Sequence, residues 1–125
     1  MKKKLMPLFA ILSLGAAAVA QADCTYPRAP DRMPDGSSAS LDDMKVAKGQ
    51  VEKYNKDMEA YLSCIKLEHD DVVAKQGSSL SEDQKKQMNL MYAQKNDAAV
   101  DELQAVANRF NDQVKAYKAK HPPKN

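Results

Sequence analysis

The stretch from Leu41 to Lys75 constrains the fold of this chain more than any other part of the sequence. Its apolar residues recur in steps of three and four, which is the spacing that gathers side chains along one stripe of an α-helix. The stripe consists of Met44, Ala47, Val51, Tyr54, Met58, Tyr61 and Ile65, with Val72 continuing it. Glu68 is the one position that interrupts it. Because a narrow stripe of this length is typical of coiled coils, we expect a helix over residues 41–76 to lie against a second helix.

The second helix is predicted over residues 82–120. Ser81 and Gln84 have the spacing of a capping box, which opens helices, and the proline pair at 122–123 ends the helix. Between the two helices, Gly77 is expected to close the first one in the left-handed conformation that glycine tolerates. The apolar side of the second helix carries Met88, Met91, Tyr92, Ala99, Leu103, Val106, Phe110, Val114 and Tyr117.

The two apolar stripes match each other when the chain is folded back at residues 78 and 79. In an antiparallel hairpin the position numbers of facing residues add to a constant, and here five pairs add to 157. Large side chains then face small ones twice, as interdigitating layers require. The pairs are Ala47 with Phe110, Val51 with Val106, Tyr54 with Leu103, Met58 with Ala99, and Ile65 with Tyr92. The predicted fold class is therefore all-α, a long antiparallel two-helix hairpin that resembles a coiled coil.

Residues 1–22 have the features of a cleavable export signal. Three lysines open the segment, and the run from Leu5 to Val19 contains no charged residue. Ala20 and Ala22 are the small residues that a signal peptidase recognises, so cleavage is expected before Asp23. A retained membrane anchor is the alternative, but the apolar run is short for a bilayer span. We therefore expect the periplasm as the location, with secretion as the alternative, and no stable membrane insertion after removal of the leader.

Residues 23–40 are predicted to form an extended strap. Three prolines, spaced by three and four residues, exclude a helix and suit a polyproline II segment. Cys64 is expected about 36 Å from the start of the first helix, whereas the strap can reach about 50 Å. Two thiols beyond an export signal most simply form one disulfide, with two unpaired thiols as the alternative. We therefore expect the strap to double back along the first helix, held by a Cys24–Cys64 disulfide.

Removal of the leader changes the charge of the chain. The whole sequence has a formal net charge of +2, which includes three leader lysines, and the remaining 103 residues have a net charge of −1. This balance gives no support to a nucleic-acid partner. The remaining chain is long enough for one small domain, divided into the strap, the hairpin over 41–121 and a tail over 122–125.

No catalytic, cofactor-binding or metal-binding residue is predicted. His69 lies beside Glu68, Asp70 and Asp71, which are residue types that bind metals, but adjacent positions of a helix point to different faces. We interpret this cluster as a solvated helix end. A two-helix rod also offers little concavity for an active site.

The tyrosines and methionines are interpreted as packing residues. Tyr54 and Tyr61 lie on one side of the first helix and Tyr26 lies in the strap, and stacking of these rings on Pro27 or Pro30 is expected to bind the strap to the helix. An aromatic groove for a foreign peptide is the alternative, and it would require the strap to leave. Met88 is assigned to the core between the helices, and Met91 is expected to be partly exposed.

Two resemblances follow from these residues. Cys24, the three prolines and the sequence Tyr-Leu-Ser-Cys at 61–64 resemble a group of short exported proteobacterial proteins with no assigned activity, which implies the disulfide and the helical layout. The sequence Leu-Ser-Glu-Asp-Gln at 80–84 is similar to the Leu-Thr-x-x-Gln motif of the Spy and CpxP family of periplasmic chaperones. That family carries the motif twice and folds into a cradle-shaped helical dimer, whereas this chain carries it once, with serine in place of threonine.

These observations favour a non-enzymatic protein that binds a protein partner, as yet unidentified, through a helix face. A chaperone-like protein that shields unfolded clients during envelope stress is the alternative. A two-helix hairpin buries few residues, so pairing into a four-helix homodimer is a further hypothesis.

Overall fold

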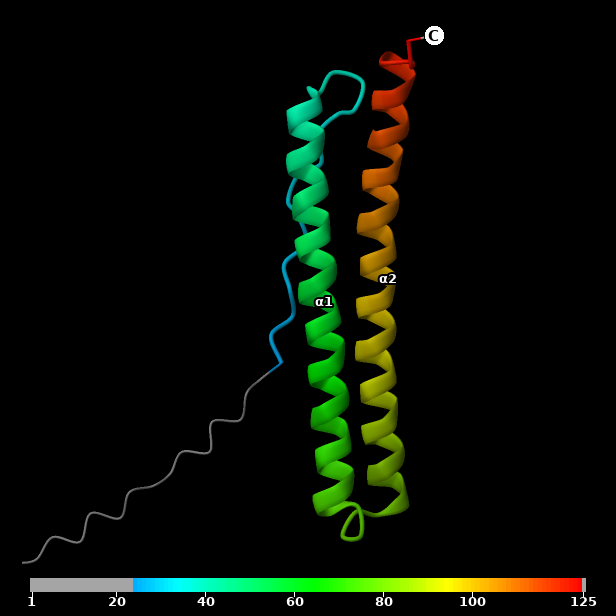
Figure 1. The fold of residues 1–125 in the computed structure, drawn as a ribbon. Coiled ribbons are helices and arrows are strands. Elements are labelled where there is room, and N and C mark those ends of the chain that lie inside the picture. The colour runs from blue at the N-terminus through cyan, green and yellow to red at the C-terminus, as the bar shows by residue number, and fades with distance from the viewer. Residues whose placement is uncertain (1–23, 125) are drawn as a thin grey trace, which may run out of the picture.

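The structure, a computed structural model, describes residues 24–124 and contains two long antiparallel helices (Figure 1). Helix α1 comprises Leu41–Gln76 and helix α2 comprises Glu82–Lys120, so the predicted all-α hairpin and both helix ranges are confirmed. The predicted export signal, with Ala20, Ala22 and Asp23 at its cleavage site, lies outside the described residues. Within 24–124, neither helix is apolar enough over a sufficient length to cross a membrane.

Both helices begin with a complete capping box. The Ser81 hydroxyl accepts a hydrogen bond of 3.2 Å from the Gln84 N–H, and the Gln84 side chain accepts one of 2.8 Å from the Ser81 N–H. Ser40 and Asp43 make the same reciprocal pair at the start of α1. Hydrogen bonds from the Ser40 hydroxyl and N–H hold the pKa of the Asp43 carboxyl below its usual value. Each box satisfies amide groups that the first turn of a helix leaves without a partner.

The end of α1 differs from the prediction for Gly77. Its backbone is right-handed, with φ −56° and ψ −37°, and its N–H donates to the Val73 carbonyl. The next turn is closed by Ser79 and Leu80, whose N–H groups both donate to the Gln76 carbonyl. The carbonyls of Val73 and Gln76 thus have partners while Gly77 remains right-handed, so the left-handed cap predicted at Gly77 is wrong.

The core follows the stripe of α1. All seven residues of the stripe from Met44 to Ile65 are buried, whereas only Ala99 and Val106 are buried on α2. Near the loop, the His69 ring lies against Tyr92 and its Nε2 atom contacts Asn89. These two pairs of position numbers add to 161 and 158, which is within about one helical turn of the predicted constant. The stripe of α1 is more deeply buried because it packs against two neighbours, α2 and the strap.

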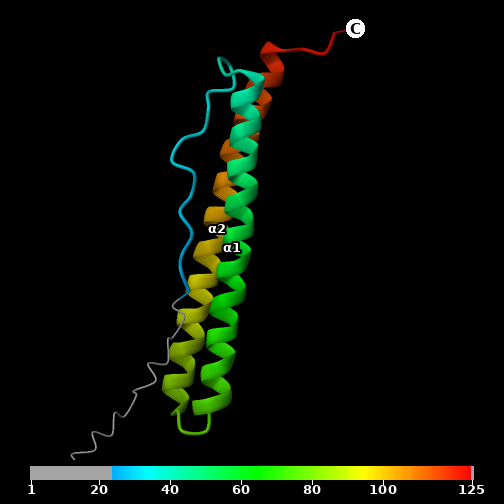
Figure 2. The same ribbon diagram turned by 60° about the vertical axis from the view of Figure 1, so that its left-hand side comes forward.

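The strap runs beside the hairpin from Cys24, which is bonded to Cys64, towards the start of α1 (Figure 2). It contacts both helices rather than α1 alone. The Tyr26 hydroxyl donates a hydrogen bond of 2.6 Å to the Glu102 carboxylate, and the Gly36 N–H donates one of 2.9 Å to the Gln113 side chain. The strap therefore ties α1 and α2 together.

Replacing Gly36 with alanine is expected to lift the turn of the strap away from α2. Gly36 is buried, and a Cβ atom there would lie 1.9 Å from the backbone carbonyl oxygen of Gln113. Since this oxygen belongs to a helix, the strap has to move, and overpacking of this kind costs about 1–3 kcal/mol. Denaturant unfolding measures the loss. Gly49→Ala is the control, because no atom lies within 4 Å of its added Cβ and alanine should stabilise that helix by about 1 kcal/mol; equal effects would refute the close approach.

Candidate functional site

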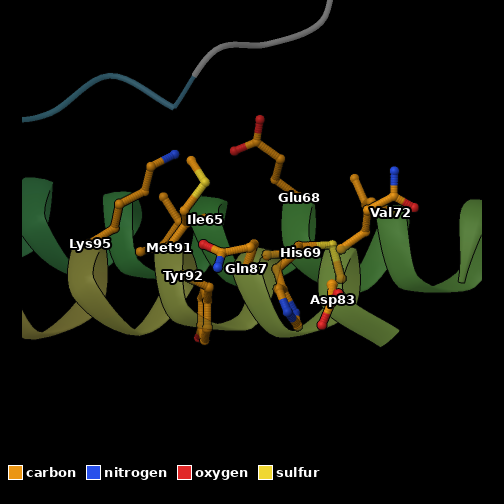
Figure 3. Close-up of a pocket in the computed structure, with 11 residues that line it drawn as sticks. Ile65, Glu68, His69, Val72, Asp83, Gln87, Met91, Tyr92 and Lys95 are labelled. Carbon is orange, nitrogen blue, oxygen red and sulfur yellow. The ribbon is translucent and has the colours of Figure 1, made fainter. Parts of the chain in front are cut away.

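Among residues 24–124, the strap leaves the part of the hairpin between Cys64 and the loop uncovered. Its first described residue, Cys24, is bonded to Cys64, and the rest of the strap runs towards the start of α1. On the other side of Cys64, a groove of about 490 Å³ lies between the helices. We call it the distal groove (Figure 3). Its walls are formed by Ile65, Glu68, His69 and Val72 of α1 and by Asp83, Gln84, Gln87, Met88, Met91, Tyr92 and Lys95 of α2.

The groove exists because the apolar stripe of α1 continues beyond Cys64, the residue to which the strap is bonded. Ile65 and Val72 continue the stripe beyond Cys64, and Met88 and Met91 face them from α2. Met91 is 57 % exposed, although it is a large apolar residue. Figure 3 shows Met91, Glu68 and Lys95 pointing to the side of the helices along which the strap runs. The distal groove is therefore apolar along its length, with charged groups at its rim.

His69 lies between the helices instead of in solvent. Its side chain is 18 % exposed, its Nε2 atom lies 2.8 Å from Asn89 Oδ1, and its ring centroid lies 4.7 Å from that of Tyr92. The interpretation of His69 as part of a solvated helix end is therefore wrong. Packing against α2 determines its position, and nothing in the local sequence reveals that contact.

The acidic residues around His69 form pairs within α1. The Asp70 carboxylate lies 2.6 Å from Lys66 Nζ, and this bond holds the pKa of Asp70 below its usual value and raises that of Lys66. Asp71 pairs with Lys75 at 2.8 Å. Within residues 24–124, no three His, Cys, Asp or Glu side chains lie together as metal ligands. The local acidic cluster acts as a set of helix-stabilising ion pairs.

The tyrosines hold the strap. The Tyr26 ring packs edge-on against Tyr61, with 4.9 Å between centroids and 72° between planes. Partial burial raises the pKa of the Tyr26 hydroxyl, and its bond to Glu102 raises it further. Burial also raises the pKa of Tyr54, whose hydroxyl is buried without a hydrogen bond. The disulfide and these rings together fix the strap on the hairpin.

Replacing Tyr26 with phenylalanine is expected to remove the tyrosine ionisation at the highest pH. Folding favours the protonated hydroxyl of Tyr26. The resulting contribution to the free energy of unfolding is therefore complete below the unfolded pKa of about 10, and it is lost as the pH rises through the higher pKa of the folded state. Loss of its hydrogen bond is expected to cost about 0.5–1.5 kcal/mol. Ultraviolet absorbance of tyrosinate follows the titration. Glu102→Gln, which keeps the ring, should shift the same ionisation to lower pH, and an unchanged titration would contradict the assignment.

The chemistry of the distal groove suits apolar side chains of a ligand. Apolar walls supply contact area, and a few polar groups at the rim fix orientation, as in many binding sites.

Comparisons with protein-family models, curated proteins and solved structures give no match to this chain. Sequence reasoning assigned Met88 to the core and did not find the groove. The sequence does contain a signal for the groove, because the apolar stripe runs to Val72 whereas the strap is bonded to Cys64.

Proposed function

We propose that this chain is a non-enzymatic exported protein that binds a protein partner through the distal groove. One observation carries the proposal: the apolar surface between α1 and α2 continues beyond the strap, and Met91 stands 57 % exposed on it. Exposed apolar surface with a polar rim is typical of interaction sites. The Cys24–Cys64 disulfide supports an oxidising location, the periplasm or the extracellular space. The proposal assigns no catalytic residue, cofactor or metal.

Site-specific photo-crosslinking in intact cells tests the proposal. A crosslinking residue at Met91 is expected to capture a protein, whereas one at Leu90 is not. Leu90 is the matched control, because it is 49 % exposed on the same helix but does not line the groove. Replacing Val72 with aspartate on the opposite wall should remove the adduct while circular dichroism remains unchanged. Equal capture from both positions, or capture that persists in the Val72→Asp variant, would refute the groove as the site.

A chaperone-like function is the second candidate, and the two methionines of the groove favour it. Met88 and Met91 have flexible, polarisable side chains that adapt to varied apolar partners. This function predicts that the purified protein suppresses the aggregation of a reduced model protein at modest molar ratios. Met91→Asp should weaken the suppression and Leu90→Asp should not. Light scattering measures both, and absence of suppression by the unsubstituted protein would remove this candidate.

A further inference from the structure

The strap shows which kind of chain packs between these two helices. Cys24, Pro27, Pro30, Met33 and Gly36 are half-buried or buried, so burial recurs at every third residue. A period of three residues is that of the polyproline II helix. Ala29 and Pro34 beside them are also half-buried, and the residues at 25, 28, 31 and 35 are exposed. The surface formed by α1 and α2 therefore already carries one non-helical segment whose burial has the three-residue period of a polyproline II helix.

The distal groove continues this surface. Tyr54, Met58 and Tyr61 belong to the part of the core that carries the strap, and Ile65 follows them on the same stripe at the groove. The Cys24 sulfur lies 3.7 Å from the Glu68 carboxylate, which is part of the groove wall. The groove thus begins beside Cys24, the first described residue of the strap. A second extended segment can therefore lie in line with the strap.

The rim of the groove carries two charges of opposite sign. Glu68 stands on α1 and Lys95 on α2, and both point to the side of the strap (Figure 3). Most exposed acidic residues of α1 pair with a lysine three or four positions away. Within residues 24–124, by contrast, neither Glu68 nor Lys95 forms a salt bridge. The pair complements a ligand that carries both a basic and an acidic side chain.

We infer that the distal groove binds an extended, polyproline II-type segment of a partner protein. Its apolar residues recur at every third position, its basic side chain lies at Glu68 and its acidic side chain at Lys95. The α2 wall spans the 12 steps from Asp83 to Lys95, about 18 Å of helix, which accommodates about five or six residues of polyproline II chain. This inference rests on the proposed function and specifies the chemistry of the partner.

A fluorescent peptide that copies residues 24–37, with Cys24→Ser, is the probe. It carries the three-residue period and both arginines and aspartates, and the intact disulfide keeps the protein's own strap in place. Fluorescence anisotropy with the exported, disulfide-bonded protein is expected to show saturable binding. A peptide of the same composition, permuted so that no apolar residues stand three apart, should bind about tenfold more weakly.

Variants of the protein locate the bound peptide. Met91→Asp should raise the Kd about tenfold and Leu90→Asp should leave it within about twofold. Glu68→Lys should also weaken binding, and a peptide with both arginines replaced by glutamate should recover it. Circular dichroism and thermal unfolding establish that each variant is folded. Equal binding by the Met91→Asp and Leu90→Asp variants would overturn the inference, as would equal binding of the permuted peptide.

The remaining outcomes separate this inference from the proposed function. Two outcomes would overturn the inference that an extended segment of a partner protein binds in the groove. One is helix formation by the bound peptide, and the other is a crosslink from Met91 to a second copy or to the chain's own residues before Cys24. If Met91 captures another protein in cells but the probe does not bind, the inference fails and the proposed function stands. If Met91 captures no protein, both fail.

Discussion

Replacing Cys24 and Cys64 with serine is expected to lower the free energy of unfolding by about 4 kcal/mol. The disulfide joins residues 40 positions apart. It therefore closes a large loop in the unfolded chain and reduces the conformational entropy of that state. The bond itself costs the folded state little free energy, because the two Cα atoms lie 5.6 Å apart, within the ordinary range for a disulfide. A loss of this size is a large fraction of the stability of a small domain. Urea unfolding of the double variant measures it.

The same substitution should also release the strap selectively. Beyond the disulfide, the contacts that hold it include the Tyr26–Glu102 and Gly36–Gln113 hydrogen bonds and the packing of Ala29 and Met33. Hydrogen exchange should therefore accelerate in residues 24–39 before it accelerates in α1. The unsubstituted protein in a dithiol reductant is the matched control and should lose the same free energy. A double variant that loses less than about 1 kcal/mol would show that these contacts fix the strap without the disulfide.

The two helices could be predicted from the sequence because their signals are local and periodic. The stripe from Met44 to Ile65 repeats along α1, and the capping box at Ser81 marks the start of α2 within four residues. The disulfide could be predicted because there are only two cysteines. Each of these inferences needed only residues that lie close in sequence or that are few in number.

The contacts of the strap with α2 could not be predicted in this way. Tyr26 and Glu102 are 76 residues apart, and Gly36 and Gln113 are 77 apart. Each contact is a single pair with no repeating pattern to identify it. Gly77 illustrates the opposite failure: a local preference for a left-handed cap was overridden by hydrogen bonds from the following turn. The distal groove depends on both kinds of information, the length of the stripe and the end of the strap.

Replacing Met58 with alanine tests the register of the two helices at the centre of the core. Met58 is fully buried, and the predicted pairing places it against Ala99, which is also fully buried. Removing a buried methionine side chain leaves a cavity and is expected to cost about 2–5 kcal/mol. Met91→Ala is the control, since an exposed methionine on α2 should change stability by less than about 0.5 kcal/mol. Chemical unfolding measures both variants.

The reverse substitution on α2 makes the test specific to the pair. Ala99→Met alone should overpack the seam and cost about 1–3 kcal/mol. If Met58 and Ala99 face each other, the double variant with alanine at 58 and methionine at 99 exchanges the large and small side chains across one layer. It should then be more stable than the sum of the two single losses by about 1 kcal/mol or more, because contacting residues are coupled. Strict additivity would place the two residues in separate layers and shift the register along the whole hairpin, including the walls of the distal groove.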